Sequence, residues 1–111
     1  MYTYTAHCMN GVFQRDKRVT VDERLKNAPY SQAGWCNFDN GWYFMSYASL
    51  VFKATRGQDS EELIIEPMDV VPAFSRTTSK QTTLALKELG YTREEIERIK
   101  SALNDSKTIR I

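Results

Sequence analysis

The chain has 111 residues, with 15 Lys and Arg against 14 Asp and Glu and a formal net charge of +1. Its 41% hydrophobic and 26% charged fractions are ordinary for a globular protein and argue against disordered, collagen-like and coiled-coil classes. We expect one domain over residues 1–111, because a chain of this length can bury a single core without metal or disulfide support. The near-zero net charge argues against strong non-specific attraction to nucleic acid or membranes, although it allows a local charged patch.

The N-terminal part of the chain predicts a hairpin and a short helix. Residues 2–9 alternate with the period of a strand, and Asn10-Gly11 is a strong turn signal before a returning strand over residues 12–15. Residues 19–28 are ambiguous, but Thr20 and Glu23 have the spacing of a capping box and a proline follows at position 29. We therefore expect a short helix in that segment.

The central part predicts strands rich in aromatic residues. Residues 35–38 and 42–53 flank Asp39-Asn40-Gly41, which reads as a second hairpin. The longer arm carries apolar side chains on both faces, so we expect it to be a central strand that is covered above and below. A turn at residues 57–59 then leads to a half-buried strand over residues 61–66.

Beyond the last proline the apolar period becomes helical. We expect Thr77 or Thr78 to cap a first helix, with Leu86 and Leu89 on its inner stripe and Gly90 ending it in a left-handed conformation. Thr92 and Glu95 then form a capping box that opens a second helix, whose inner stripe is Ile96, Ile99 and Leu103. The tail, residues 107–111, either adds an edge strand or frays.

These elements predict an α+β fold, in which an antiparallel sheet of about four to five strands is followed by a C-terminal helix pair. One face of the sheet and the inner stripes of both helices need mutual cover, so we expect them to share one core. The predicted members of this core are Leu50, Phe52, Ile65, Leu86, Leu89, Ile96, Ile99 and Leu103.

The residue inventory argues against catalysis. His7 is the only histidine, and a catalytic triad or a zinc site would have to use it from within a predicted strand. Cys8 and Cys36 are isolated and are expected to be small, reduced core residues, and the glycines fall at turns rather than in a phosphate-binding loop. We expect no enzymatic activity, no cofactor and no metal. With no long apolar run and no secretion signal at the N-terminus, we also expect a cytoplasmic protein without a membrane partner.

Two groups of residues are candidates for binding a partner. The first is the aromatic block from residue 35 to residue 52; most of it is expected in the core, with one or two of Trp35, Tyr43 and Tyr47 exposed as contacts. The second is Arg76 and Lys80, two cations at the start of the first helix, where free backbone N–H groups suit an anionic group. An ordinary helix cap is the alternative for this segment. The basic residues 15, 17 and 18 are the alternative site.

Residues 89–96, Leu-Gly-Tyr-Thr-Arg-Glu-Glu-Ile, carry two resemblances. The segment resembles the turn of a helix-turn-helix, in which a glycine ends one helix and a Ser or Thr caps the recognition helix. It also resembles the first loop of ubiquitin-associated-type three-helix modules. Glu94, Glu95 and Glu97 would oppose DNA phosphates on such a recognition helix, and Leu86 stands where a small residue is usual.

A further resemblance rests on Trp42–Tyr47 and on Ser75–Gln81, which reads Ser-Arg-Thr-Thr-Ser-Lys-Gln. These segments resemble motifs of small proteins encoded by phages and other mobile elements, with Gln81 in place of a His. The resemblance implies a non-enzymatic accessory protein that binds a host or defence-complex protein in the host cytoplasm, such as an anti-CRISPR inhibitor. The alternative is a small nucleic-acid-binding regulator that uses Arg76, Lys80 and the helix pair. A third reading is an accessory subunit that self-associates through exposed aromatic residues.

Overall fold

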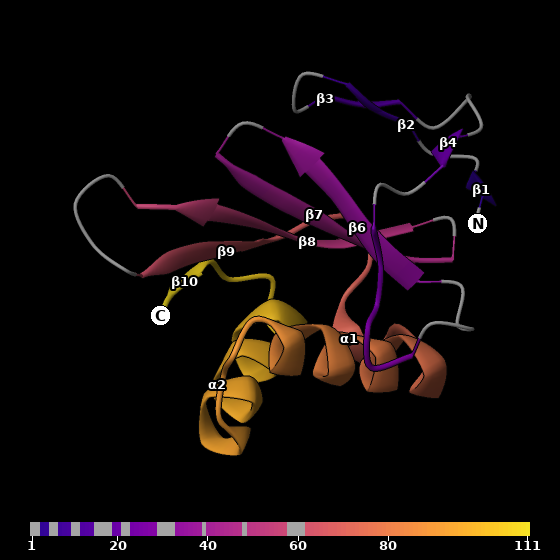
Figure 1. Cartoon of the computed structure of the whole chain (residues 1–111). Helices are drawn as coiled ribbons and strands as arrows, with labels where there is room; N and C mark the ends of the chain where they lie inside the picture. Colours follow the sequence, from indigo (N-terminus) through magenta and orange to yellow (C-terminus); the bar gives the residue numbers. More distant parts are fainter. Residues whose placement is uncertain are drawn as a thin grey trace.

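The computed structural model describes residues 3–4, 7–9, 12–14, 19–20, 23–28, 33–38, 40–47, 49–57 and 62–111. Strands occupy the first part of the chain and two helices follow, with one short strand after them. A twisted antiparallel sheet has the two helices packed on one of its faces (Figure 1). This arrangement confirms the predicted α+β fold.

The first four strands form two small antiparallel pairs. They are β1 (Thr3–Tyr4) with β4 (Val19–Thr20), and β2 (His7–Met9) with β3 (Val12–Gln14). Met9 lies opposite Val12, which confirms the predicted first hairpin, although its turn residues 10–11 lie outside the described residues. The strand predicted over residues 2–9 is divided, because β1 and β2 pair with different partners.

The helix predicted over residues 19–28 is wrong. Thr20 belongs to β4, Glu23–Arg24 forms strand β5, and a turn follows at residues 26–27. The backbone of β5 pairs with the strand that contains Trp35, while the fully buried Leu25 enters the core. A helix this short is marginal on its own, so pairing with the sheet overrides the local capping signal.

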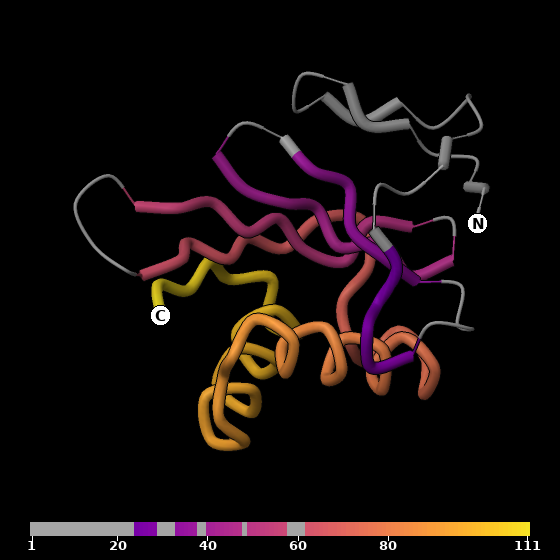
Figure 2. The backbone as a smooth tube through the Cα atoms, in the orientation of Figure 1, coloured from indigo at the N-terminus to yellow at the C-terminus, as the bar shows by residue number. Residues whose placement is uncertain are grey.

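The main sheet has the strand order β10-β9-β8-β7-β6-β5, and every neighbouring pair is antiparallel. Its longer strands are β6 (Ala33–Phe38), β7 (Gly41–Ser46), β8 (Ser49–Arg56) and β9 (Leu63–Pro67). Phe38 lies opposite Gly41, as predicted for the second hairpin. The last strand, β10 (Ile109–Arg110), pairs with β9 at the sheet edge, so the C-terminus returns beside β9 (Figure 2). Of the two predictions for the tail, the edge strand is confirmed.

The single long strand predicted over residues 42–53 is two strands. Ser46 lies opposite Ser49, and the turn between them begins at Tyr47, whose φ is 56°. The segment Ser-Tyr-Ala-Ser contains none of the Gly, Asn, Asp or Pro residues that mark turns, so the sequence pattern concealed this one. A register shift between Phe44 and Met45 further alters which side chains share a face.

A 3-10 turn, η1 (Pro72–Phe74), leads into helix α1 (Arg76–Glu88). The N-cap of α1 is Ser75, not Thr77 or Thr78 as predicted, and its Oγ accepts a hydrogen bond from the Thr78 backbone N–H at 3.0 Å. The helix begins directly after η1, so the first of the three hydroxyl residues becomes the cap. Thr78 is buried in the first turn instead.

The predicted junction between the helices is confirmed. Gly90 has a φ of 93°, its N–H bonds to the carbonyl of Lys87, and the Tyr91 N–H bonds to the carbonyl of Leu86. This pair of bonds is the glycine-dependent ending of a helix known as the Schellman motif. Helix α2 (Arg93–Asn104) then begins with the predicted capping box of Thr92 and Glu95.

The core lies between the sheet and the helices. Trp35, Phe44 and Phe52 pack against one another there, in tilted and edge-to-face orientations, with ring centroids 5.3 to 5.9 Å apart. Six of the eight predicted core residues belong to this cluster: Phe52, Ile65, Leu86, Ile96, Ile99 and Leu103. Leu50 is fully buried but lies outside the cluster, and Leu89 is only partly buried at its edge. Among the described residues, no helix is long and apolar enough to cross a membrane.

Candidate partner-binding surface

Arg76 and Lys80 lie one helical turn apart on α1, and both side chains are exposed. They line one side of a cavity of about 360 Å³. The remaining lining residues are Ala28, Thr77, Gln81 and Leu84. The two predicted cations therefore flank a hollow large enough to receive a side chain of another molecule.

Trp35 and Tyr43 are not the exposed members of the three aromatic residues, of which we expect one or two to reach solvent. Both are buried, so neither is offered to a partner. Trp35 packs against Phe44 and Phe52, and its indole N–H donates to a Glu88 carboxylate oxygen at 3.2 Å. These rings are used to fill the interior, because a small domain has few other large side chains for that purpose.

Tyr47 is the one exposed residue of the three aromatic candidates, with 46% of its surface accessible. It begins the turn between β7 and β8, at the same end of the molecule as the first turn of α1 (Figure 1). The preceding residue, Ser46, donates a buried hydrogen bond of 2.6 Å to the Gln81 Oε1 of α1. This bond ties the end of β7, one residue before Tyr47, to the residue of α1 that follows Lys80.

Phe74 is a candidate that the sequence analysis missed. It is 70% exposed, more than any other large hydrophobic side chain that the structure describes. It precedes the Ser75 cap, a position from which a hydrophobic residue often packs against the fourth helical residue. Here the fourth helical residue is the polar Ser79, so Phe74 lacks this apolar contact. A phenylalanine before the cap together with a polar fourth helical residue is the sequence signal that would have identified Phe74 as exposed.

The backbone beneath Phe74 is well anchored. The Ala73 N–H donates to the Asn104 Oδ1 at 2.8 Å, which joins η1 to the end of α2. The Phe74 N–H bonds to the carbonyl of Val71 at 2.9 Å.

We name the set Tyr47, Phe74, Arg76 and Lys80 the α1 entry surface.

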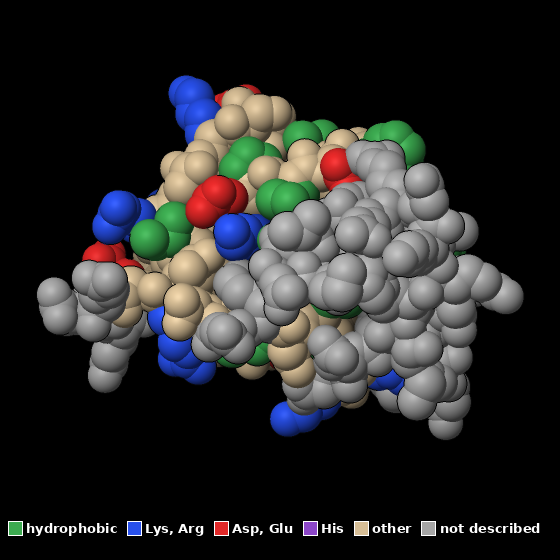
Figure 3. Space-filling model, turned by 90° about the horizontal axis from the view of Figure 1, so that it is seen from above, with side chains coloured by type: hydrophobic (Ala, Val, Ile, Leu, Met, Phe, Trp, Pro, Cys, Tyr) green, Lys and Arg blue, Asp and Glu red, His purple; other side chains and the backbone are tan. Residues whose placement is uncertain are grey.

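The exposed charged residues of α1 are all cations. The first turn of α1, Arg-Thr-Thr-Ser, contains no carboxylate, so nothing in it neutralises the positive end of the helix dipole. Arg76, Lys80 and Lys87 are exposed and follow one line along the helix at a spacing of four and seven residues. On the face seen from above, by contrast, cations and carboxylates of the described residues are interspersed (Figure 3).

Possible metal ligands, Cys36 and the alternative basic site are the remaining features that the sequence raised. Among the described residues, no group of three or more His, Cys, Asp or Glu is arranged to hold a metal ion. Cys36 is buried, with its Sγ 3.2 Å from the Met45 Sδ, as expected for a core residue. The alternative basic site at residues 15, 17 and 18 lies outside the described residues.

Among the residues that the structure describes, two pKa values are shifted, and both belong to the helix junction. Hydrogen bonds from Thr92 lower the pKa of the Glu95 carboxyl. Burial, reinforced by the charge of Glu95, raises the pKa of the Tyr91 hydroxyl, which donates to the carbonyl of Ile111. Glu95 thus stabilises the start of α2, Tyr91 ties the junction to Ile111, and both lie outside the α1 entry surface.

Searches against protein-family models, curated proteins and solved structures found no match to this chain.

Proposed function

We propose that this protein acts by binding another protein through the α1 entry surface, and not by catalysis. The observation that carries the proposal is the exposure of Phe74 two residues before the exposed Arg76. Aromatic and Arg side chains dominate the binding energy of protein interfaces, whereas an isolated exposed phenylalanine gains nothing in water. A partner with an apolar recess for Phe74 would bury it.

The anchored backbone supports the same proposal. Because η1 is held by Asn104, Phe74 is presented from a fixed main chain, and binding costs less conformational entropy than from a free loop. Arg76 and Lys80 beside the adjoining cavity select an acidic partner, with a carboxylate of the partner in the cavity. The proposed partner therefore combines an acidic patch with an apolar recess.

The class of partner follows from the resemblance to phage and mobile-element proteins. It suggests a host or defence-complex protein in the host cytoplasm, whose active surface is occupied by this chain in the manner of an anti-CRISPR inhibitor. This assignment rests on the two short motifs alone. The surface chemistry constrains the partner's charge and shape, and does not depend on which host machine is the target.

A nucleic-acid-binding regulator is the second candidate, favoured by the line of cations along α1. Arg76, Lys80 and Lys87 would follow a phosphate backbone, with α1 rather than α2 against the nucleic acid. The first turn of α2 contains Glu94 and Glu95, which disfavours it as a recognition helix. Exposed Phe74 and Tyr47 would then stack on unpaired bases.

The proposal is tested by capturing the tagged protein with its partner from host lysate, with and without nuclease. We expect a stoichiometric protein partner that survives nuclease. Phe74→Ala and the double change Arg76→Glu with Lys80→Glu should each reduce its recovery at least about tenfold, as expected for interface hot spots.

The matched control is Arg98→Glu with Lys107→Glu, which makes the same charge change at two exposed residues outside the α1 entry surface. It should leave recovery of the partner unchanged, and circular dichroism should show that all variants fold. Full recovery with Phe74→Ala contradicts the protein-binding proposal. Recovery that disappears with nuclease favours the nucleic-acid candidate instead.

A further inference from the structure

A second cavity, of about 460 Å³, lies between α1 and α2. It is lined by Thr83 and Lys87 of α1 and by Arg93, Ile96, Glu97 and Lys100 of α2. None of these residues belongs to the α1 entry surface. The cavity is within the range of volumes that hold small organic ligands.

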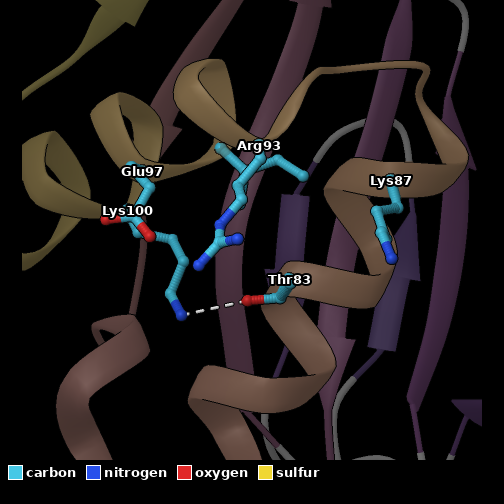
Figure 4. Close-up of a pocket in the computed structure, with 6 residues that line it drawn as sticks. Thr83, Lys87, Arg93, Glu97 and Lys100 are labelled. Carbon is cyan, nitrogen blue, oxygen red and sulfur yellow. Dashed lines mark hydrogen bonds between the residues drawn. The ribbon is translucent and has the colours of Figure 1, made fainter.

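The Lys100 side chain lines this cavity, and its ammonium group bonds to hydroxyl groups rather than to a carboxylate. Its Nζ donates to the Ser79 Oγ at 2.7 Å. It also donates to the Thr83 Oγ1 at 3.0 Å (Figure 4). Hydroxyl groups fix the direction of the ammonium group but leave its charge intact. Since an ammonium group has three N–H donors, one is left for a ligand.

Arg93 extends from the first residue of α2 into the same space, and its guanidinium ends near Thr83 and Lys100 (Figure 4). No hydrogen bond joins Arg93 or Lys87 to the other residues drawn there. The lining contains three cations against the single carboxylate of Glu97, a formal charge of +2. The cationic donors of this site therefore already lie together, and their positive charge exceeds what the Glu97 carboxylate can neutralise.

This charge and geometry suit a phosphate group. A phosphomonoester carries a charge of about −1.5 to −2 at neutral pH and three terminal oxygens, and the fork of an arginine binds two of them in parallel. The apolar Ile96 offers a surface for the organic part of the ligand. We propose that this cavity binds the phosphate group of a small organic phosphate or of a nucleic acid, with Arg93 and Lys100 as its main ligands.

The experiment titrates the full chain with four probes while backbone amide resonances are recorded by NMR. The probes are inorganic phosphate, AMP, adenosine as the control without phosphate, and an unphosphorylated single-stranded oligothymidine. We expect phosphate and AMP, but not adenosine, to shift the amides of Thr83, Arg93 and Lys100. Arg93→Gln, at an exposed position, should weaken AMP binding at least about tenfold through the loss of charge-assisted hydrogen bonds.

Arg98→Gln is the matched control, because it removes the same charge from an exposed position of the same helix outside the cavity. It should change AMP affinity less than about twofold. Lys100→Met is a second variant that keeps the hydrocarbon stem and should also weaken binding. Shifts with the oligothymidine alone, lost in Arg93→Gln, support the phosphate site with a nucleic-acid backbone as its source. The proposal is overturned if no phosphate probe shifts these amides at millimolar concentration, or if both arginine variants weaken binding equally.

Discussion

The hydrogen bond between Ser46 and Gln81 allows a quantitative test of how the sheet holds α1. Both side chains are almost fully buried, with 2% and 5% of their surface exposed, and the Ser46 hydroxyl donates to the Gln81 Oε1 at 2.6 Å. Ser46→Ala removes the donor and leaves a buried amide oxygen without its partner. The expected cost is about 1 to 3 kcal/mol in the free energy of unfolding.

The double variant separates the hydrogen bond from packing. Gln81→Met keeps the length of the side chain and removes its polar atoms, so Ser46→Ala in that background leaves no acceptor unsatisfied. When both partners of a buried hydrogen bond become apolar, the combined change is close to neutral. The two single changes should therefore be non-additive, with an interaction free energy of at least about 1 kcal/mol.

The measurement is urea unfolding followed by tryptophan fluorescence, because the buried Trp35 reports on the same core. Ser101→Ala is the control, since it makes the same substitution at an exposed position of α2 and should change stability by no more than about 0.5 kcal/mol. Additivity of Ser46→Ala and Gln81→Met within about 0.3 kcal/mol would refute the reasoning, because the bond would then contribute nothing specific.

Four further outcomes are expected. Thr55→Val should raise stability by about 1 kcal/mol in urea unfolding, because the Thr55 Oγ1 is buried without a hydrogen-bond partner in the described structure. Gly41→Ala should lower stability by at least about 2 kcal/mol, since the added Cβ would lie 1.9 Å from the Ala54 carbonyl oxygen; an unchanged melting temperature would contradict this contact. Thr92→Ala should cost about 1 kcal/mol and speed amide hydrogen exchange in the first turn of α2. Because its pKa is lowered in the folded state, Glu95 stabilises the protein above its ordinary pKa of 4.5 and loses this effect as pH falls, so the wild type should approach Glu95→Gln in stability at low pH.

Local signals predicted the elements whose conformation depends on a few neighbouring residues. The hairpin that brings Phe38 opposite Gly41, the glycine ending of α1 and the capping box of Thr92 each depend on backbone preferences within four positions. The segment 19–28 was mispredicted as a helix, because its strand β5 forms only by pairing with β6, which follows later in the chain. The turn at Tyr47 escaped prediction for another reason, since a non-glycine residue adopts the left-handed conformation there.

The candidate surface was only partly predictable for the same reasons. Arg76 and Lys80 follow from their place at a helix start, which is a local property. Which of the aromatic residues face solvent depends on what covers each face of the sheet, and Tyr43 is buried beside Cys36, its partner across β6 and β7. The cavity between the helices depends on how α1 packs against α2, and no spacing in the sequence encodes that packing.

The order of the strands has a consequence for the rate of folding. From β5 to β9, every strand pairs with the strand that precedes or follows it in the chain, and the two helices are also consecutive. Most backbone pairing therefore closes short loops, whose entropy cost is small and whose contacts form early. Two sets of contacts span long stretches of chain. They are the pairing of β10 with β9 and the hydrogen bonds that Asn27 and Trp35 donate to the Glu88 carboxylate. We expect a transition state in which the meander is formed while β10 and these bonds are absent, so that substitutions at Glu88 accelerate unfolding and leave the folding rate almost unchanged.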